Sequence, residues 1–242
     1  MKTGIIRHIP NTITCLNLVC GCFSIIASLN GNLTFAAVWI VVSAVFDFCD
    51  GLSARILKVT SVIGKELDSL SDVVSFGVAP TMIVYRWLSE CYLQMPPSMQ
   101  GSVVPYLKYA VFLVPALSAV RLARFNTDTR QDENFIGLPT PANALFLGFI
   151  PASSDYVSIL HNYWVVLFFA VAFALLLVSP INMLSMKFKD FRPTGMNVAR
   201  YIILFVGIAL FLMFRLGSFP LIIFGYLLVS VFYHTLTKLE VI

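Results

Sequence analysis

The sequence predicts an all-α fold, a polytopic bundle of transmembrane helices. Of its 242 residues, 59% are hydrophobic and 12% are charged, and the mean hydropathy is +0.88. Soluble domains carry about 25% charged residues. Several apolar runs also approach the roughly 20 residues that a helix needs to cross a bilayer. These features exclude a secreted domain and a conventional soluble enzyme, and a net charge of +4 is too small to indicate nucleic-acid binding.

Eight apolar segments divide the chain. They cover residues 11–30, 33–57, 62–88, 105–125, 140–153, 162–180, 197–215 and 218–237. Gly, Pro and polar residues interrupt the apolar pattern between them, for example at 30–32 and 95–98. The fifth segment is short, so we expect it to be tilted, broken or fused with its neighbour. No internal repeat is evident, and we expect a single integral membrane domain over residues 1–242.

The first segment resembles a signal peptide, because Lys2 and Arg7 precede an apolar run. No convincing small-residue cleavage site follows it. Asn11, Thr14 and Asn17 also form a polar stripe at helical spacing, which a signal peptide does not need. We therefore expect an uncleaved first helix whose polar stripe either lines a cavity or bonds to neighbouring helices.

Basic residues are unevenly distributed between alternate connections. If the N-terminus is cytoplasmic, thirteen Lys and Arg residues fall on the inside: Lys2, Arg7, Arg55, Lys58, Lys65, Arg121, Arg124, Arg130, Lys187, Lys189, Arg192, Arg200 and Lys238. Three fall on the outside: Arg86, Lys108 and Arg215. The positive-inside rule and an even number of spans predict that both termini are cytoplasmic.

Four aspartates lie where the second and third apolar segments meet. Asp47 and Asp50 are three residues apart, and Asp68 and Asp72 are four apart, so each pair occupies one helix face. Because the intervening turn is short, the two helices should be antiparallel, with all four carboxylates at the cytoplasmic end. An ionised Asp costs about 2.5–3.5 kcal/mol at the centre of a membrane helix. Hard divalent cations would neutralise such a cluster, and they prefer oxygen ligands.

The alternative to a metal site is a set of interfacial ion pairs. The basic residues that could form them are Arg55, Lys58 and Lys65. Pairing alone does not require two helix faces in register, so we favour the metal site. Small residues flank the acidic faces: Gly51, Ala54 and Gly64 each lie four positions from an aspartate. They leave room for a diphosphate-bearing substrate whose lipid part stays in the bilayer.

This region resembles the signature of the CDP-alcohol phosphatidyltransferases. The pattern Asp47-x₂-Asp50-Gly51-x₂-Ala54-Arg55-x₈-Gly64-x₃-Asp68-x₃-Asp72 matches all eight fixed positions. The resemblance implies two divalent metal ions, Mg²⁺ or Mn²⁺ or else Ca²⁺, held by the four aspartates. It also implies a CDP-linked lipid bound by Gly51, Ala54, Arg55 and Gly64. An alcohol would attack the lipid-side phosphorus, CMP would leave, and Asp72 would take the proton of the alcohol as the catalytic base.

Other segments resemble the membrane-embedded phosphatidylserine synthases of that family. These segments are residues 10–21, 75–80, 121–126 and 137–142. The resemblance implies CDP-diacylglycerol and L-serine as substrates, a homodimer, and a site at the cytoplasmic face of the cell inner membrane. It covers residues 8–190, a six-helix catalytic core, whereas residues 195–242 carry no recognised motif and are expected to add two transmembrane helices.

Two arginines are candidates for binding the serine carboxylate. Arg121 and Arg124 are three residues apart at the cytoplasmic end of a helix, and guanidinium groups bind carboxylates through paired hydrogen bonds. Asn11 is a third candidate. The same chemistry would bind the phosphate of glycerol 3-phosphate or an inositol phosphate, and both arginines could merely determine topology. A cation-binding transporter is a different alternative, but no second acidic site continues across the membrane midplane.

Overall fold

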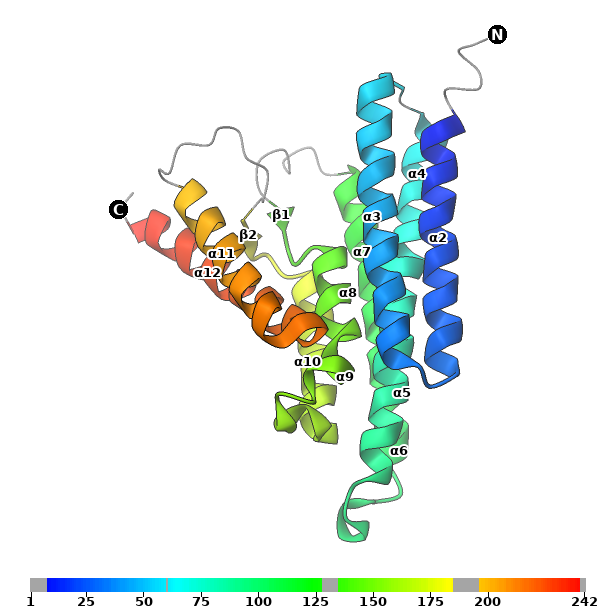
Figure 1. Ribbon diagram of the computed structural model, residues 1–242, viewed down its shortest axis with the longest axis vertical. Helices are drawn as coiled ribbons and strands as arrows, with labels where there is room; N and C mark the ends of the chain where they lie inside the picture. The colour runs from blue at the N-terminus through cyan, green and yellow to red at the C-terminus, as the bar shows by residue number, and fades with distance from the viewer. Residues whose placement is uncertain (1–7, 60, 128–134, 185–195, 240–242) are drawn as a thin grey trace.

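The computed structural model describes residues 8–59, 61–127, 135–184 and 196–239, and it is an all-α bundle (Figure 1). Within these residues, five helical runs are long and apolar enough to cross a membrane. They are His8–Leu29, Leu33–Leu57, Val62–Leu93, Val104–Thr127 and Asn197–Tyr233. The predicted all-α membrane fold is confirmed. Six basic residues of the topology prediction lie outside the described residues: Lys2, Arg7, Arg130, Lys187, Lys189 and Arg192.

The N-terminal half begins with two long helices, which a further helical run follows. These elements are α2 (His8–Leu29), α3 (Leu33–Leu57), α4 (Val62–Asp72), the π-helical η1 (Val73–Val78) and α5 (Ala79–Leu93). The connection to the next span contains η2 (Pro97–Met99), and that span comprises α6 (Val104–Leu107), η3 (Lys108–Phe112) and α7 (Leu113–Thr127). Figure 1 shows α2 and α3 side by side along α4 and α5.

The C-terminal half contains shorter helices and a helical hairpin. It comprises β1 (Phe135–Ile136), α8 (Thr140–Gly148), α9 (Ile150–Ser153), η4 (Ser158–His161), α10 (Tyr163–Leu177), β2 (Asn182–Met183), α11 (Met196–Phe214), η5 (Arg215–Ser218) and α12 (Phe219–Leu239). The fifth apolar segment is thus broken, at Phe149 between α8 and α9. The two strands pair antiparallel, with Phe135 opposite Met183.

Capping residues define the turn between α3 and α4. Lys58 ends α3 in a left-handed conformation with φ of 52°, and its backbone N–H bonds to carbonyls of the last helical turn. Ser61 begins α4 by accepting a hydrogen bond from the Gly64 backbone N–H at 2.9 Å. Such caps satisfy backbone groups that the helix ends would leave unpaired. Because both helices end within this short turn, their acidic segments lie at the same end of the bundle.

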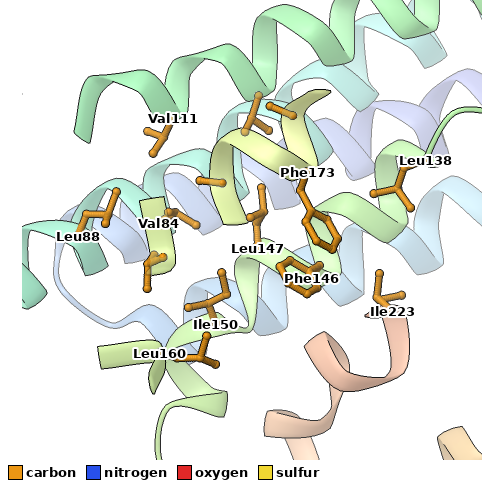
Figure 2. Packing of buried hydrophobic residues seen from close by; sticks show 14 of the residues in the cluster. Val84, Leu88, Val111, Leu138, Phe146, Leu147, Ile150, Leu160, Phe173 and Ile223 are labelled. Atoms are coloured by element: carbon orange, nitrogen blue, oxygen red, sulfur yellow. The ribbon is translucent and has the colours of Figure 1, made fainter. Parts of the chain in front are cut away.

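Two apolar clusters hold the bundle together. One surrounds Ile40 and Phe76 and joins α2, α3, η1, α5 and α8. The other joins α5, α7, α8, α10 and α12, and Figure 2 shows its side chains converging around Leu147. Within it, Phe146 and Phe173 stack with ring centroids 3.6 Å apart. These clusters position α4, η1, α7 and α8 relative to one another.

Helix α2 approaches η1 closely at Gly21. A Cβ atom at this position would lie 2.6 Å from Ser75 Oγ and 2.9 Å from Ser75 Cα. We expect Gly21→Ala to lower the unfolding temperature in detergent, because overpacking of this kind typically costs about 1–3 kcal/mol. The matched control is Gly225→Ala, where a Cβ would meet nothing within 4 Å. Equal unfolding temperatures for the two variants would contradict the close approach.

Candidate active site

Three of the four predicted aspartates converge at the junction of α3 and α4. Asp47 and Asp50 occupy the last turns of α3, and Asp68 lies on α4. One carboxylate oxygen from each lies within 4.8 Å of the other two. The fourth, Asp72, is buried at the end of α4 and is an electrostatic neighbour of Asp47 and Asp68. The structure therefore brings all four acidic groups into one region.

The oxygens of this acidic cluster fit a cation. Asp50 Oδ2 and Asp68 Oδ1 are buried and have no hydrogen-bond partner among the described residues. A buried unpaired carboxylate oxygen is costly in a membrane helix. A divalent cation with oxygen preference would satisfy both atoms. The donor set therefore fits the divalent ions that the sequence predicts.

Two of the three basic residues of the alternative interpretation bind backbone carbonyls instead of the aspartates. Arg55 Nε donates to the Gly51 carbonyl at 3.0 Å, and Lys65 Nζ donates to the Asn126 carbonyl at 2.8 Å. Within the described part of the chain, the one salt bridge joins Arg86 and Glu90. Ion pairing with the turn therefore does not neutralise the acidic cluster.

Asn17 connects the base candidate to three helical elements. Its buried side chain donates from Nδ2 to Asp72 Oδ1 at 3.3 Å. Ser43 of α3 hydrogen-bonds to Asn17, and Ser75 of η1 donates to the Asn17 carbonyl at 3.0 Å. The polar stripe on α2 thus serves both purposes left open by the sequence, because Asn17 bonds between helices whereas Asn11 and Thr14 line a cavity. Sequence reasoning found Asn17 only as part of this stripe.

A cavity of about 640 Å³ adjoins the acidic cluster. Its lining residues are Pro10, Asn11, Thr14, Asp50, Gly51, Ala54, Val59, Ser61, Val62, Gly64, Lys65 and Asp68. Three of the four residues predicted to bind the CDP-linked lipid are therefore on its wall, together with two predicted metal ligands. Arg55, the fourth, is exposed and does not line it.

The two glycines of this cavity differ in their surroundings. A Cβ at Gly64 would lie 2.8 Å from Ser61 Oγ and 3.0 Å from Asn11 Oδ1, so a larger residue there would displace one of these polar side chains. A Cβ at Gly51 would meet nothing within 4 Å. The missing side chain of Gly51 is therefore not needed for packing, and it leaves open space beside Asp50.

The predicted serine-binding residues are separated in the structure. Arg121 is 8% exposed, whereas Arg124 is exposed at the surface of α7. Arg121 has Asp72 as an electrostatic neighbour, and its Nε has no hydrogen-bond partner among the described residues. Asn11 lies on the cavity wall beside Gly64. Of the three, Arg121 is thus the buried cation that interacts electrostatically with the base candidate.

The family model described as CDP-alcohol phosphatidyltransferase matches residues 7–236. The chain belongs to this family. The family predicted from the aspartate signature is therefore confirmed, and the acidic cluster lies within the matched region.

Individual members of the CDP-alcohol phosphatidyltransferase family extend this comparison. The chain is 31% identical over 205 residues to the CDP-diacylglycerol–serine O-phosphatidyltransferase of Helicobacter pylori, covering 83% of this chain and 80% of that protein. It is 34% identical over 136 residues to the Bacillus subtilis protein of the same name, covering 56% of this chain and 70% of that protein. It is 32% identical over 180 residues to the archaetidylserine synthase of Methanothermobacter thermautotrophicus, covering 72% of this chain and 68% of that protein.

Proposed function

We propose that this chain transfers the phosphatidyl group of CDP-diacylglycerol to L-serine, giving phosphatidylserine and CMP. The observation that carries the proposal is the acidic cluster at the junction of α3 and α4, two of whose members, Asp50 and Asp68, line the 640 Å³ cavity. The names of the relatives, which specify serine as the acceptor, support the choice of alcohol.

Asp47, Asp50, Asp68 and Asp72 would hold two divalent ions, Mg²⁺ or Mn²⁺ or else Ca²⁺. Bound there, such ions would supply the positive charge that neutralises the diphosphate and stabilises CMP as a leaving group. The unpaired oxygens of Asp50 and Asp68 support this assignment. Without cations, the carboxylates would repel the diphosphate of the substrate.

The residues around the cavity would bind the nucleotide of CDP-diacylglycerol. Gly51 and Ala54 leave space along α3, and Gly64 allows α4 to approach Asn11. Arg55, although exposed, lies one turn beyond Gly51 and would contact the nucleotide from the rim. This arrangement would hold the reacting diphosphate against the acidic cluster.

Asp72 would accept the proton of the serine hydroxyl. Because Asn17 donates to Oδ1, the orientation of the carboxylate is restrained before substrate binds. A hydroxyl is a weak nucleophile at neutral pH, so a positioned base accelerates its attack. Arg121, with Arg124 and Asn11 as the other candidates, would bind the serine carboxylate. Burial of Arg121 beside Asp72 supports it most directly.

The test of this function is CMP release by the purified protein. CDP-diacylglycerol is supplied with Mg²⁺ or Mn²⁺, and L-serine, glycerol 3-phosphate and inositol phosphate are offered separately. We expect metal-dependent CMP release and phosphatidylserine formation with serine alone. Product from a phosphate acceptor instead would assign a different transferase. Metal uptake into proteoliposomes without CMP release would assign a transporter.

We further propose a single membrane domain, with a core over residues 8–190 and a helical hairpin over 195–242, that forms a homodimer in the cell inner membrane. Packing of α12 against α8 supports one domain. Light scattering in detergent should give a protein mass of two 26.9-kDa chains. A mass of one chain would contradict the homodimer.

Both termini and the acidic cluster would face the cytoplasm. Lys58 is exposed at the C-terminal end of α3, whereas Met99 is exposed in η2, within the connection between α5 and α6. Figure 1 shows this connection at the opposite end of the bundle from the C-terminal end of α3. In a cysteine-free background, we expect Met99→Cys to react with an impermeant thiol reagent in intact cells and Lys58→Cys to react only after permeabilisation. The reverse pattern would overturn the orientation.

Filling the space beside Gly51 should block the nucleotide without harming the fold. We expect Gly51→Leu to raise the KM for CDP-diacylglycerol at least about tenfold, because small displacements of a bound substrate cost this much or more. Gly225→Leu is the matched control, since it is also a helical glycine with nothing within 4 Å of its Cβ position. If both variants keep the wild-type KM, Gly51 does not border the bound nucleotide.

A further inference from the structure

Three buried side chains on α7 and α8 carry polar atoms that have no hydrogen-bond partner among the described residues. They are Ser118 through its hydroxyl, Arg121 through Nε, and Asn143 through both amide atoms. Ser118 and Asn143 are fully buried, and Arg121 is 8% exposed. Neither Ser118 nor Asn143 belongs to the acidic cluster or to the cavity beside Gly51.

Ser118 and Asn143 lie on the faces of α7 and α8 that contribute to one apolar cluster, at the end nearer the aspartates. Val114 of α7 and Leu147 of α8 belong to the same apolar cluster. Ser118 follows Val114 by one turn, and Asn143 precedes Leu147 by one turn. Figure 1 shows α7 running toward the end of the bundle where α3 ends and α4 begins, and α8 running away from it. Both helices therefore change from apolar to polar at the same end.

The same end of this face adjoins the catalytic base candidate. A Cβ at Gly77 of η1 would lie 3.4 Å from Ser118 Cβ, and η1 begins directly after Asp72. Helix α8 also contacts η1. Arg121 has both Asp72 and Tyr226 as electrostatic neighbours, and Tyr226 belongs to α12, which packs against α8. Ser118 thus packs against η1, Arg121 interacts electrostatically with Asp72, and Asn143 lies on the helix that contacts both η1 and α12.

An amide with no partner is unfavourable inside a membrane bundle, where water cannot replace the missing bonds. Proteins retain such groups where a ligand completes them. The four unpaired atoms comprise a guanidinium donor, an amide donor, an amide acceptor and a hydroxyl. Together they match a small zwitterion. The guanidinium and amide donors can bind a carboxylate, and the amide oxygen and the hydroxyl oxygen can accept hydrogen bonds from an ammonium group.

We propose that Ser118, Arg121 and Asn143 form the subsite that binds the amino and carboxylate groups of the acceptor L-serine, an inference that rests on the proposed function. Arg121 and Asn143 Nδ2 hold the carboxylate, and Asn143 Oδ1 with Ser118 Oγ holds the ammonium group. The serine hydroxyl then points toward Asp72. One guanidinium group combined with a neutral amide and a neutral hydroxyl suits an acceptor of zero net charge better than a phosphate dianion.

The test uses Asn143→Leu, which keeps the side-chain size but removes both polar atoms, and Ser118→Ala. We expect Asn143→Leu to raise the KM for serine about tenfold to a hundredfold, the range for lost hydrogen bonds to charged groups. Ser118→Ala should raise it less. The KM for CDP-diacylglycerol should stay within about twofold of wild type, because the nucleotide cavity is separate.

Thermal unfolding without serine separates ligand binding from a structural role. Asn143→Leu should be as stable as wild type or more stable, because an unpaired buried amide has been removed. Serine should raise the unfolding temperature of wild type but not of the variant. The matched control is Ser153→Ala, since the buried Ser153 hydroxyl contacts the Phe149 and Gly217 carbonyls at 3.0 and 2.7 Å. It should lower stability and leave the KM for serine unchanged.

An unchanged serine KM in both Asn143→Leu and Ser118→Ala would overturn the subsite. A second result would also overturn it: Asn143→Leu is less stable than wild type, whereas Asn143→Asp has both the stability and the serine KM of wild type. The Asn143 side chain would then have a structural role. Both comparisons are made only if the wild-type protein releases CMP in the presence of serine. Wild-type protein that transfers only to another acceptor would instead refute the proposed function, so the two failures are distinguishable.

Discussion

Replacement of Asp72 by Asn is expected to lower serine-dependent turnover about 10²–10⁴-fold, the usual contribution of a general base. The amide keeps the shape of the side chain and one oxygen that can face a metal ion. It loses the carboxylate that would take the proton of the serine hydroxyl. Because the Asn17 amide donates to Asp72 Oδ1 at 3.3 Å, the new side chain should keep its orientation through its own oxygen.

Two measurements on the Asp72→Asn protein define its role. Calorimetry should show that metal-dependent binding of CDP-diacylglycerol is retained, while the assay of CMP release shows the loss of turnover. Asp155→Asn is the control, since Asp155 is exposed and lies outside the site. Turnover near the wild-type rate would remove Asp72 as the base. Loss of binding as well would make it primarily a metal ligand.

Replacement of Asp68 by Asn should abolish metal-dependent binding of CDP-diacylglycerol rather than turnover alone. One Asp68 carboxylate oxygen lies within 4.8 Å of ligand oxygens of Asp47 and Asp50, and its buried Oδ1 has no hydrogen-bond partner among the described residues. Loss of an outer-sphere group around a metal typically costs 10–100-fold in affinity. Loss of a direct ligand should therefore weaken binding at least about a hundredfold.

The binding of Mn²⁺ to purified protein, followed by electron paramagnetic resonance, tests this prediction independently of activity. Glu66→Gln is the matched control, because Glu66 is an exposed carboxylate on the same helix, two residues away. It should leave Mn²⁺ affinity unchanged. If Asp68→Asn binds Mn²⁺ and CDP-diacylglycerol as wild type does, the acidic cluster is not the metal site.

Much of this protein could be predicted from local sequence. Apolar runs of membrane-spanning length predict helices wherever they occur, because a bilayer permits few other backbone conformations. The spacing of Asp47, Asp50 and Asp68, together with a short turn, places three carboxylates at one helix junction. The signature also predicted the family correctly. The first two inferences depend on helical periodicity and on neighbours close in the chain, and the third depends on the resemblance of the signature to a known family.

Only the tertiary structure decided which polar residues face the site. Arg121 and Arg124 are equally basic and one turn apart, yet neighbouring helices bury the first and leave the second exposed. Asn17 reaches Asp72 across 55 residues of sequence, and Asn143 becomes a buried unpaired amide through the packing of α8. Helical periodicity assigns a residue to a face of its own helix. Which other helix covers that face depends on contacts between distant segments, and no local pattern specifies them.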